Sequence, residues 1–167
     1  MKDLIQKMKE IIQEKKNLTQ QMKELTQEKI EEIRKNPDKV NWHVLCWKHK
    51  LSEPFIREFS DKVNWIVVSV HQKLSEPFVI EFSDKVDWLY ISLHQKLSEN
   101  FIRNFSDKVY WFSVSCFQDL SKEFIYEFYD KVDWKVLCEK NYNFKDAPKH
   151  IKLHVTLNYR ELLEYFK

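Results

Sequence analysis

The apolar and polar residues of this chain follow a pattern that repeats every 23 residues. Tryptophan marks the same place in each repeat, at Trp42, Trp65, Trp88, Trp111 and Trp134. The tripeptide Asp-Lys-Val stands just ahead of each tryptophan. A fixed period of this size is typical of arrays in which neighbouring units bury their apolar faces against one another. We therefore expect a repeat array over residues 37–140, made of about five units.

Each repeat has the pattern of two short helices. In its first half, Phe55, Ile56, Phe59 and Val63 form one helical stripe behind a Ser-Glu-Pro start at 52–54, which is typical of a helix N-terminus. In its second half, apolar and small residues keep helical spacing after each tryptophan, and Asn or Asp usually stands before it as a cap. Leucine-rich repeats, with a strand in each unit, are the alternative, but their Leu-x-x-Leu-x-Leu motif does not recur. The pattern predicts an all-α fold, a short α-solenoid of two-helix repeats.

Residues 1–36 show one uninterrupted helical pattern that stops at Asn36-Pro37. Read as heptads, its apolar positions form a seam suited to a coiled-coil helix. We expect this helix to join copies of the chain, as a dimer, through Leu4, Met8, Ile11, Leu18, Met22 and Leu25. Ile5 and Ile12 widen the seam, so packing onto the first repeat is the alternative.

The last segment, residues 141–167, breaks the period. Alternating apolar residues from His150 to Tyr159 are typical of a strand, and the pattern from Arg160 to Lys167 is helical. A lone strand would leave its backbone groups unpaired. We therefore favour an irregular C-terminal cap that covers the apolar face of the last repeat.

Composition excludes several classes of function. The chain has no glycine, so the glycine-rich loops that cradle phosphates and dinucleotides are missing. Its net charge is +2, with 28 basic and 26 acidic residues, and such a balance argues against nucleic-acid binding. Apolar runs such as 65–70 are far shorter than the roughly 18 residues that span a bilayer. We expect no nucleic acid, no membrane and no cofactor among its partners.

The candidate reactive side chains have structural explanations. His71 and His94 share one place in adjacent repeats, but Lys or Phe holds that place elsewhere, so we expect no metal site. Cys46 and Cys138 fill a place held by serine in the other repeats, where a small side chain lets helices approach closely. No spacing offers a base beside a nucleophile. The sequence therefore predicts no catalytic residues, and the protein is not expected to be an enzyme.

The repeat resembles a known type. The unit from Leu74 to Gln95, with its Leu-Ser-Glu start and Asp-Lys-Val-Asp-Trp centre, is similar to repeats that are abundant in proteins of giant DNA viruses. The likeness covers 38–140, and it departs at Tyr110, at Lys122-Glu123 and at 138–141. The resemblance implies a helical repeat scaffold and no particular reaction.

The positions that vary after each tryptophan predict where a partner binds. Exposed, changeable and partly aromatic surface on a repeat array is the usual binding surface. We expect a protein partner to contact Tyr90, His94, Phe112 and Phe117. The sequence hypothesis is a protein-interaction scaffold in the cytoplasm or in the virion of an infected cell. A structural component of a large DNA virus particle is the alternative.

Overall fold

The computed structural model describes residues 2–140 and 142–166, without the side chains of 2–5, 8, 15, 16, 18 and 19. Its internal contacts divide the chain into two compact units, Met1–Gln95 and Lys96–Lys167. Helices dominate both units. The predicted all-α fold of repeated helix pairs is confirmed, because within each unit the tryptophan-bearing pairs pack in a row, as in an α-solenoid.

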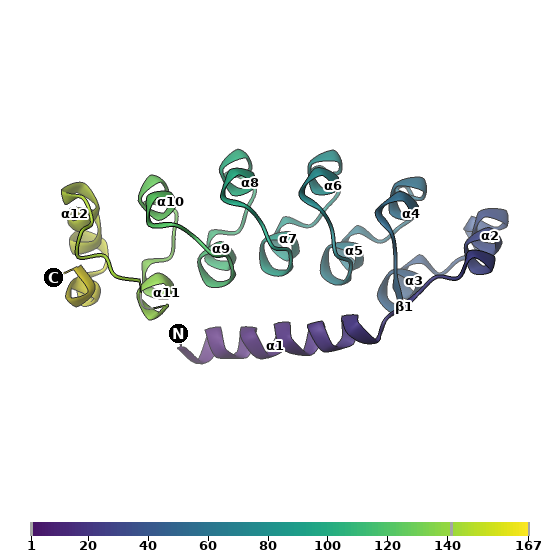
Figure 1. Cartoon of the computed structure of the whole chain (residues 1–167), viewed down its shortest axis with the longest axis horizontal. Coiled ribbons are helices and arrows are strands. Elements are labelled where there is room, and N and C mark those ends of the chain that lie inside the picture. The colour runs from purple at the N-terminus through teal and green to yellow at the C-terminus, as the bar shows by residue number, and fades with distance from the viewer. Residues whose placement is uncertain (1, 141, 167) are drawn as a thin grey trace. The chain divides into compact units, whose positions relative to one another are not determined.

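The first unit contains an N-terminal helix followed by three helix pairs. Within it, α4 and α6 lie in one layer, and the second helices of the pairs, α3, α5 and α7, lie side by side in another (Figure 1). Two short strands, β1 and β2, pair in parallel, Lys23 with His49 and Glu24 with Lys50. The elements are α1 (Lys2–Gln21), β1 (Lys23–Glu24), α2 (Gln27–Lys35), η1 (Pro37–Lys39), α3 (Trp42–Lys48), β2 (His49–Lys50), α4 (Glu53–Glu58), α5 (Trp65–His71), α6 (Glu76–Glu81) and α7 (Trp88–His94).

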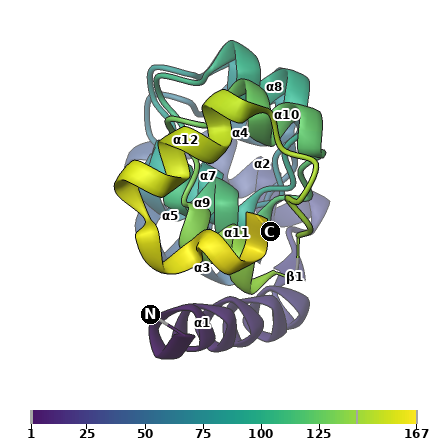
Figure 2. The same cartoon turned by 90° about the vertical axis from the view of Figure 1, so that its left-hand side faces the viewer.

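The second unit contains two helix pairs and a C-terminal segment. α12 lies across the end of this row, and η2 packs against both α12 and α11 (Figure 2). The elements are α8 (Glu99–Asn104), α9 (Trp111–Phe117), α10 (Lys122–Glu127), α11 (Trp134–Glu139), α12 (Lys149–Asn158) and the 3-10 helix η2 (Arg160–Phe166).

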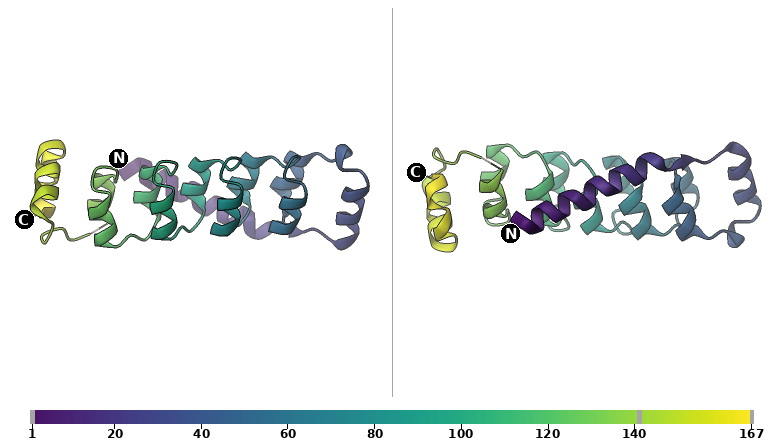
Figure 3. Two further views of the ribbon diagram at one scale, coloured as in Figure 1. Left: turned by 90° about the horizontal axis from the view of Figure 1, so that it is seen from above. Right: turned by 90° about the horizontal axis from the view of Figure 1, so that it is seen from below.

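The predicted long helix over 1–36 is wrong, because the helix ends at Gln21 and a second helix follows. α1 runs obliquely beneath the second helices of its own unit (Figure 3), and a new helix, α2, begins after Thr26. The Thr26 hydroxyl accepts a hydrogen bond from the Lys29 backbone N–H, which caps α2. Met22 is buried and the backbone at 23–24 pairs with β2. Heptad spacing continues through this break because it records only which residues recur, and not where the backbone turns.

The array begins earlier than residue 37. α2 takes the place of a first helix: Ile33 is buried like Ile56, which stands 23 residues later, and the chain enters it through Leu25-Thr26 as it enters α4 through Leu51-Ser52. α2 has nine residues where α4 has six. Because of those three extra residues, Leu25-Thr26 stands 26 and not 23 residues before Leu51-Ser52. A search at the fixed period therefore misses this first repeat.

The C-terminal segment is neither the strand that its pattern suggests at His150–Tyr159 nor the predicted irregular cap, since residues 149–158 form α12. Ile151 and Val155 are buried, whereas Leu153 and Leu157 are 58% and 73% exposed. Residues four apart share a helix face, so alternating apolar residues supply both the inner and the outer face of this helix. The segment does cover the last repeat: Phe144 and Phe166 contact the Trp134 ring at centroid distances of 5.2 and 5.5 Å.

The repeated residues form the helices as the sequence predicts, and the tryptophans join the pairs. The Ser52 hydroxyl and the Asn64 side chain accept backbone N–H groups at the starts of α4 and α5. The Trp65 indole N–H donates to the Ser60 carbonyl, and its ring lies 4.9 Å from the Phe82 ring of the next pair. Each aromatic ring therefore fills the space between successive helix pairs.

Buried glutamines connect one repeat to the one before it. The Gln72 side chain accepts the Leu51 backbone N–H at 2.8 Å and donates to the carbonyls of Cys46 and His49 at 2.7 and 2.9 Å. Gln95 repeats the arrangement with the Leu74 N–H and the Gln72 carbonyl. These backbone groups lie in irregular links between helices, so the amides satisfy polar groups that burial would leave unpaired.

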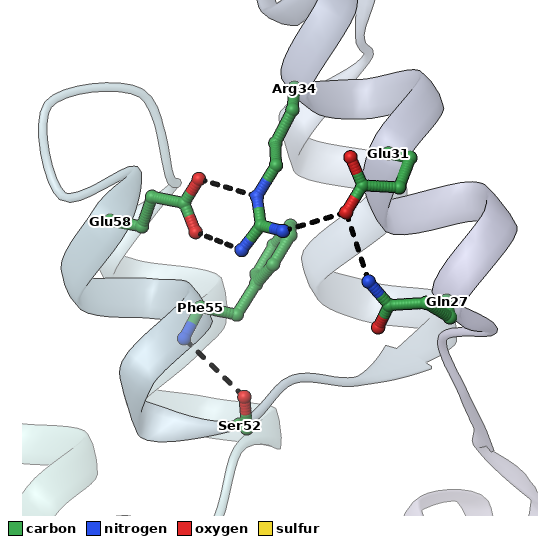
Figure 4. A network of polar contacts seen from close by, with 6 residues as sticks. All are labelled: Gln27, Glu31, Arg34, Ser52, Phe55 and Glu58. Atoms are coloured by element: carbon green, nitrogen blue, oxygen red, sulfur yellow. Dashed lines mark hydrogen bonds and ion pairs between the residues drawn. The ribbon is translucent and has the colours of Figure 1, made fainter.

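Ion pairs between first helices follow the same spacing. In the first unit, the Arg34 guanidinium binds both carboxylate oxygens of Glu58, at 2.8 and 2.7 Å, and also Glu31 (Figure 4). Arg57 binds Glu81 in the same two-pronged way, and in the second unit Arg103 binds Glu127. The hydrogen bonds from Arg57 lower the pKa of Glu81. Because these side chains are about 40% exposed, each pair contributes little to stability.

We expect the Glu81 pair to stabilise the fold at neutral pH and not in acid. A carboxylate with a lowered pKa gives stability that is present above its ordinary pKa and is lost as the pH falls through the lowered value. Glu81→Gln should therefore lower the urea midpoint at pH 7 and leave it unchanged at pH 2. Glu28→Gln, a change in an exposed carboxylate on α2, is the control. An equal loss for Glu81→Gln at both pH values would contradict the assignment.

Candidate functional site

An exposed apolar strip lies on the second helices of the first unit. It consists of the apolar residues that stand one or five places after the tryptophans at 42, 65 and 88, and we call it the outer strip. These two places share a helix face. Ile66 is 56% exposed, Trp47 47% and Leu89 37%. Val70 and Leu93 are half-buried beside them. The outer strip comprises Trp47 on α3, Ile66 and Val70 on α5, and Leu89 and Leu93 on α7.

Local structure explains why these side chains remain outside. The opposite face of each second helix is buried in the row, as Val68 and Ile91 show with no exposed surface. The helices α3, α5 and α7 lie side by side (Figure 1), so residues at the same place after each tryptophan come from neighbouring helices. At one edge, the Lys48 ammonium group lies 5.9 Å from the Trp47 ring centre, within range of a cation–π interaction.

The four residues predicted to contact a partner are half-buried. Tyr90 and His94, in the first unit, stack on each other with ring centroids 5.9 Å apart. Phe112 and Phe117 belong to α9 in the second unit. In the first unit, Tyr90 and His94 therefore lie on the same helix as the more exposed Leu89, and the sequence interpretation chose neither Leu89 nor Ile66. The signal that could have found them is the position itself, because Ile66 and Leu89 hold the same outward place after successive tryptophans.

The residues predicted to join copies of the chain differ in position and exposure. Met22 is buried and lies beside Trp47 and His71, so it is not available to a coiled-coil partner. Leu25 is half-buried and belongs to the start of α2 rather than to a seam. Ile11 is 59% exposed on α1. The side chains of Leu4, Met8 and Leu18 lie outside the described residues.

A cavity of about 500 Å³ lies between α2 and α3. Its walls combine aliphatic residues with charged ones: Lys29, Glu32, Ile33, Asn36, Lys39, Val40, Asn41, Val44, Leu45 and His49. The Lys29 ammonium is paired with the Glu32 carboxylate at 2.7 Å. His49 also lines the cavity, and its buried Nδ1 has no hydrogen-bond partner among the described residues.

Cysteine and histidine side chains elsewhere in the described chain lie in structural surroundings. Burial raises the pKa of the Cys46 thiol and raises that of Cys138 to about 12, so neither forms the thiolate that a nucleophile needs near neutral pH. Within 2–140 and 142–166, no group of three or more His, Cys, Asp or Glu side chains is placed to hold a metal ion. His150 and His154 instead meet the edge of the Tyr129 ring.

The helices of the described residues are too short or too polar to cross a bilayer. Comparison of the chain with protein-family models, with curated proteins and with solved structures finds no match. The outer strip is therefore the feature from which a function is inferred.

Proposed function

We propose that this protein is a non-enzymatic protein-interaction scaffold whose helix pairs present the outer strip to a protein partner. The observation that carries the proposal is the alignment of Trp47, Ile66 and Leu89, three large apolar side chains that are 37–56% exposed on neighbouring helices. Single exposed apolar residues are common on protein surfaces, but a contiguous set marks an interaction site. Tryptophan is also among the residues that contribute most to binding energy at protein interfaces.

The arrangement favours a protein partner over a small molecule. Apolar side chains spread over three helices form a long and shallow surface, whereas small-molecule sites enclose most of their ligand. An amphipathic helix matches such a surface, because its own apolar residues recur at three- and four-residue intervals. Self-association, in the cytoplasm or in a virion, is a further part of the proposal, and the exposed Leu153 and Leu157 on α12 favour lateral packing in an assembly.

The test is a comparison of captured partners between two matched variants of the full chain. Ile66→Glu places a charge in the outer strip, and Ile80→Glu places the same charge on α6, at an isoleucine that is equally exposed, 50% against 56%. We expect the wild type and Ile80→Glu to capture the same proteins from source cells, and Ile66→Glu to lose them by at least about tenfold, because an interface does not readily bury an unpaired charge. Unchanged capture by Ile66→Glu would refute the proposal.

A further inference from the structure

The sequence of α1 carries an apolar face, and Ile11, the residue of that face whose side chain the structure describes, is exposed. In the sequence of α1, residues 4, 8, 11 and 18 recur at three-, four- and seven-residue spacing, and therefore share one helix face. Ile11 stands at the middle of this face and is 59% exposed. Helices in proteins gain most of their stability by packing such a face against other elements. α1 is thus an amphipathic helix whose apolar face lacks a full contact at Ile11.

The chain holds the end of α1 at the edge of the outer strip. Met22, just after the helix, is only 9% exposed, and together with Gln21 it lines a small pocket of about 140 Å³ with Trp47, Lys48 and His71. The pairing of Lys23 with His49 and of Glu24 with Lys50 attaches the following residues to the end of α3. The end of α1 is therefore attached next to Trp47, which is the first residue of the outer strip.

The length of α1 matches the outer strip. Its 20 residues span about 30 Å. Two steps between neighbouring packed helices, from α3 to α5 and from α5 to α7, cover about 20 Å. α1 already runs beneath these helices in the views of Figures 1 and 3. At about 1.5 Å per residue, Ile11 lies roughly 15 Å from Gln21 at the end of α1, a distance that falls between the levels of α5 and α7.

We propose that α1 is an internal strap that closes onto the outer strip of its own chain and competes there with a partner helix. The inference rests on the proposed function of the outer strip as a binding surface. Closure pairs Ile11 and its face with Ile66 and Leu89, which are both exposed in the described state. The tether makes this contact intramolecular, with an effective concentration of about 1 mM, so α1 of the same chain outcompetes α1 of another chain at micromolar protein.

Cysteine cross-linking of the purified full chain tests the strap without a partner. Ile11→Cys with Leu89→Cys is compared with Gln13→Cys with Leu89→Cys, because Gln13 is also exposed on α1 but lies on its opposite face. The probe is a short bis-maleimide, and the native Cys46, Cys116 and Cys138 are buried. We expect the first pair to form an intramolecular cross-link at least about tenfold faster than the control pair, with the product at monomer mass.

Two results would overturn the strap. Equal rates for both pairs would mean that α1 has no preferred face toward the outer strip, and a product at dimer mass would assign the outer strip to α1 of a second copy. The result of the capture experiment with Ile66→Glu and Ile80→Glu does not depend on either of these results. The strap and the binding function of the outer strip therefore fail separately.

Discussion

Replacing Trp134 by alanine is expected to lower the free energy of unfolding by about 3–5 kcal/mol, the usual cost of deleting a buried large aromatic side chain. Trp134 has no exposed surface, and its indole N–H donates to the Tyr129 carbonyl at 2.8 Å. Phe144 and Phe166 contact its ring, so the cavity opens between the last helix pair and the C-terminal segment. Urea denaturation followed by circular dichroism measures the loss.

Trp65→Ala is the matched control for this substitution. Trp65 occupies the same place in its repeat and contacts Phe78 and Phe82, but it is half-buried. Part of its surface is already in water, so truncation removes less buried area and leaves a smaller cavity. We expect a clearly smaller loss for Trp65→Ala. Equal losses would show that the C-terminal segment does not hold Trp134 more tightly than an ordinary repeat holds its tryptophan.

Gln72→Met is expected to lower the free energy of unfolding by about 2–4 kcal/mol although the side-chain volume hardly changes. The substitution keeps the shape of the side chain but removes its three hydrogen bonds, to the Leu51 N–H and to the carbonyls of Cys46 and His49. Buried polar groups that lose their hydrogen-bond partners destabilise the folded state by their full desolvation free energy. The urea midpoint of the full chain is again the measurement.

Gln13→Met separates this burial effect from the chemistry of the residue. The Gln13 amide donates a hydrogen bond to Asn17, but it is exposed on α1, so water replaces the lost partner. We expect a change within about 0.5 kcal/mol. If both substitutions cost the same, the buried glutamines would not connect the repeats as the structure indicates.

The hydrophobic pattern predicted most of the fold for a physical reason. Trp42, Trp65 and Trp111 recur in one register because each packs on a phenylalanine of the next helix pair, and repetition makes that task visible in the sequence. The Ser and Asn caps were predictable too, since a cap acts on backbone groups only two or three residues away. Local interactions of this kind need no knowledge of the rest of the chain.

The candidate site was only partly predictable. Position after tryptophan showed that some side chains of the second helices face outward, but exposure distinguishes Ile66 and Leu89 from the half-buried Tyr90 and His94. Aromatic character does not decide exposure, because Trp47 is 47% exposed whereas Tyr90 is half-buried. Exposure depends on the adjacent helix pair, and the sequence of one helix does not contain it.

The sequence by itself therefore determined the 23-residue repeat, its two helices and their caps. Only the tertiary structure decided that Met22 and Leu25 lie outside α1, that residues 149–158 form a helix, and that the outer strip remains uncovered. Periodicity specifies which residues share a face. What covers that face depends on segments distant in the sequence, and only packing brings them together.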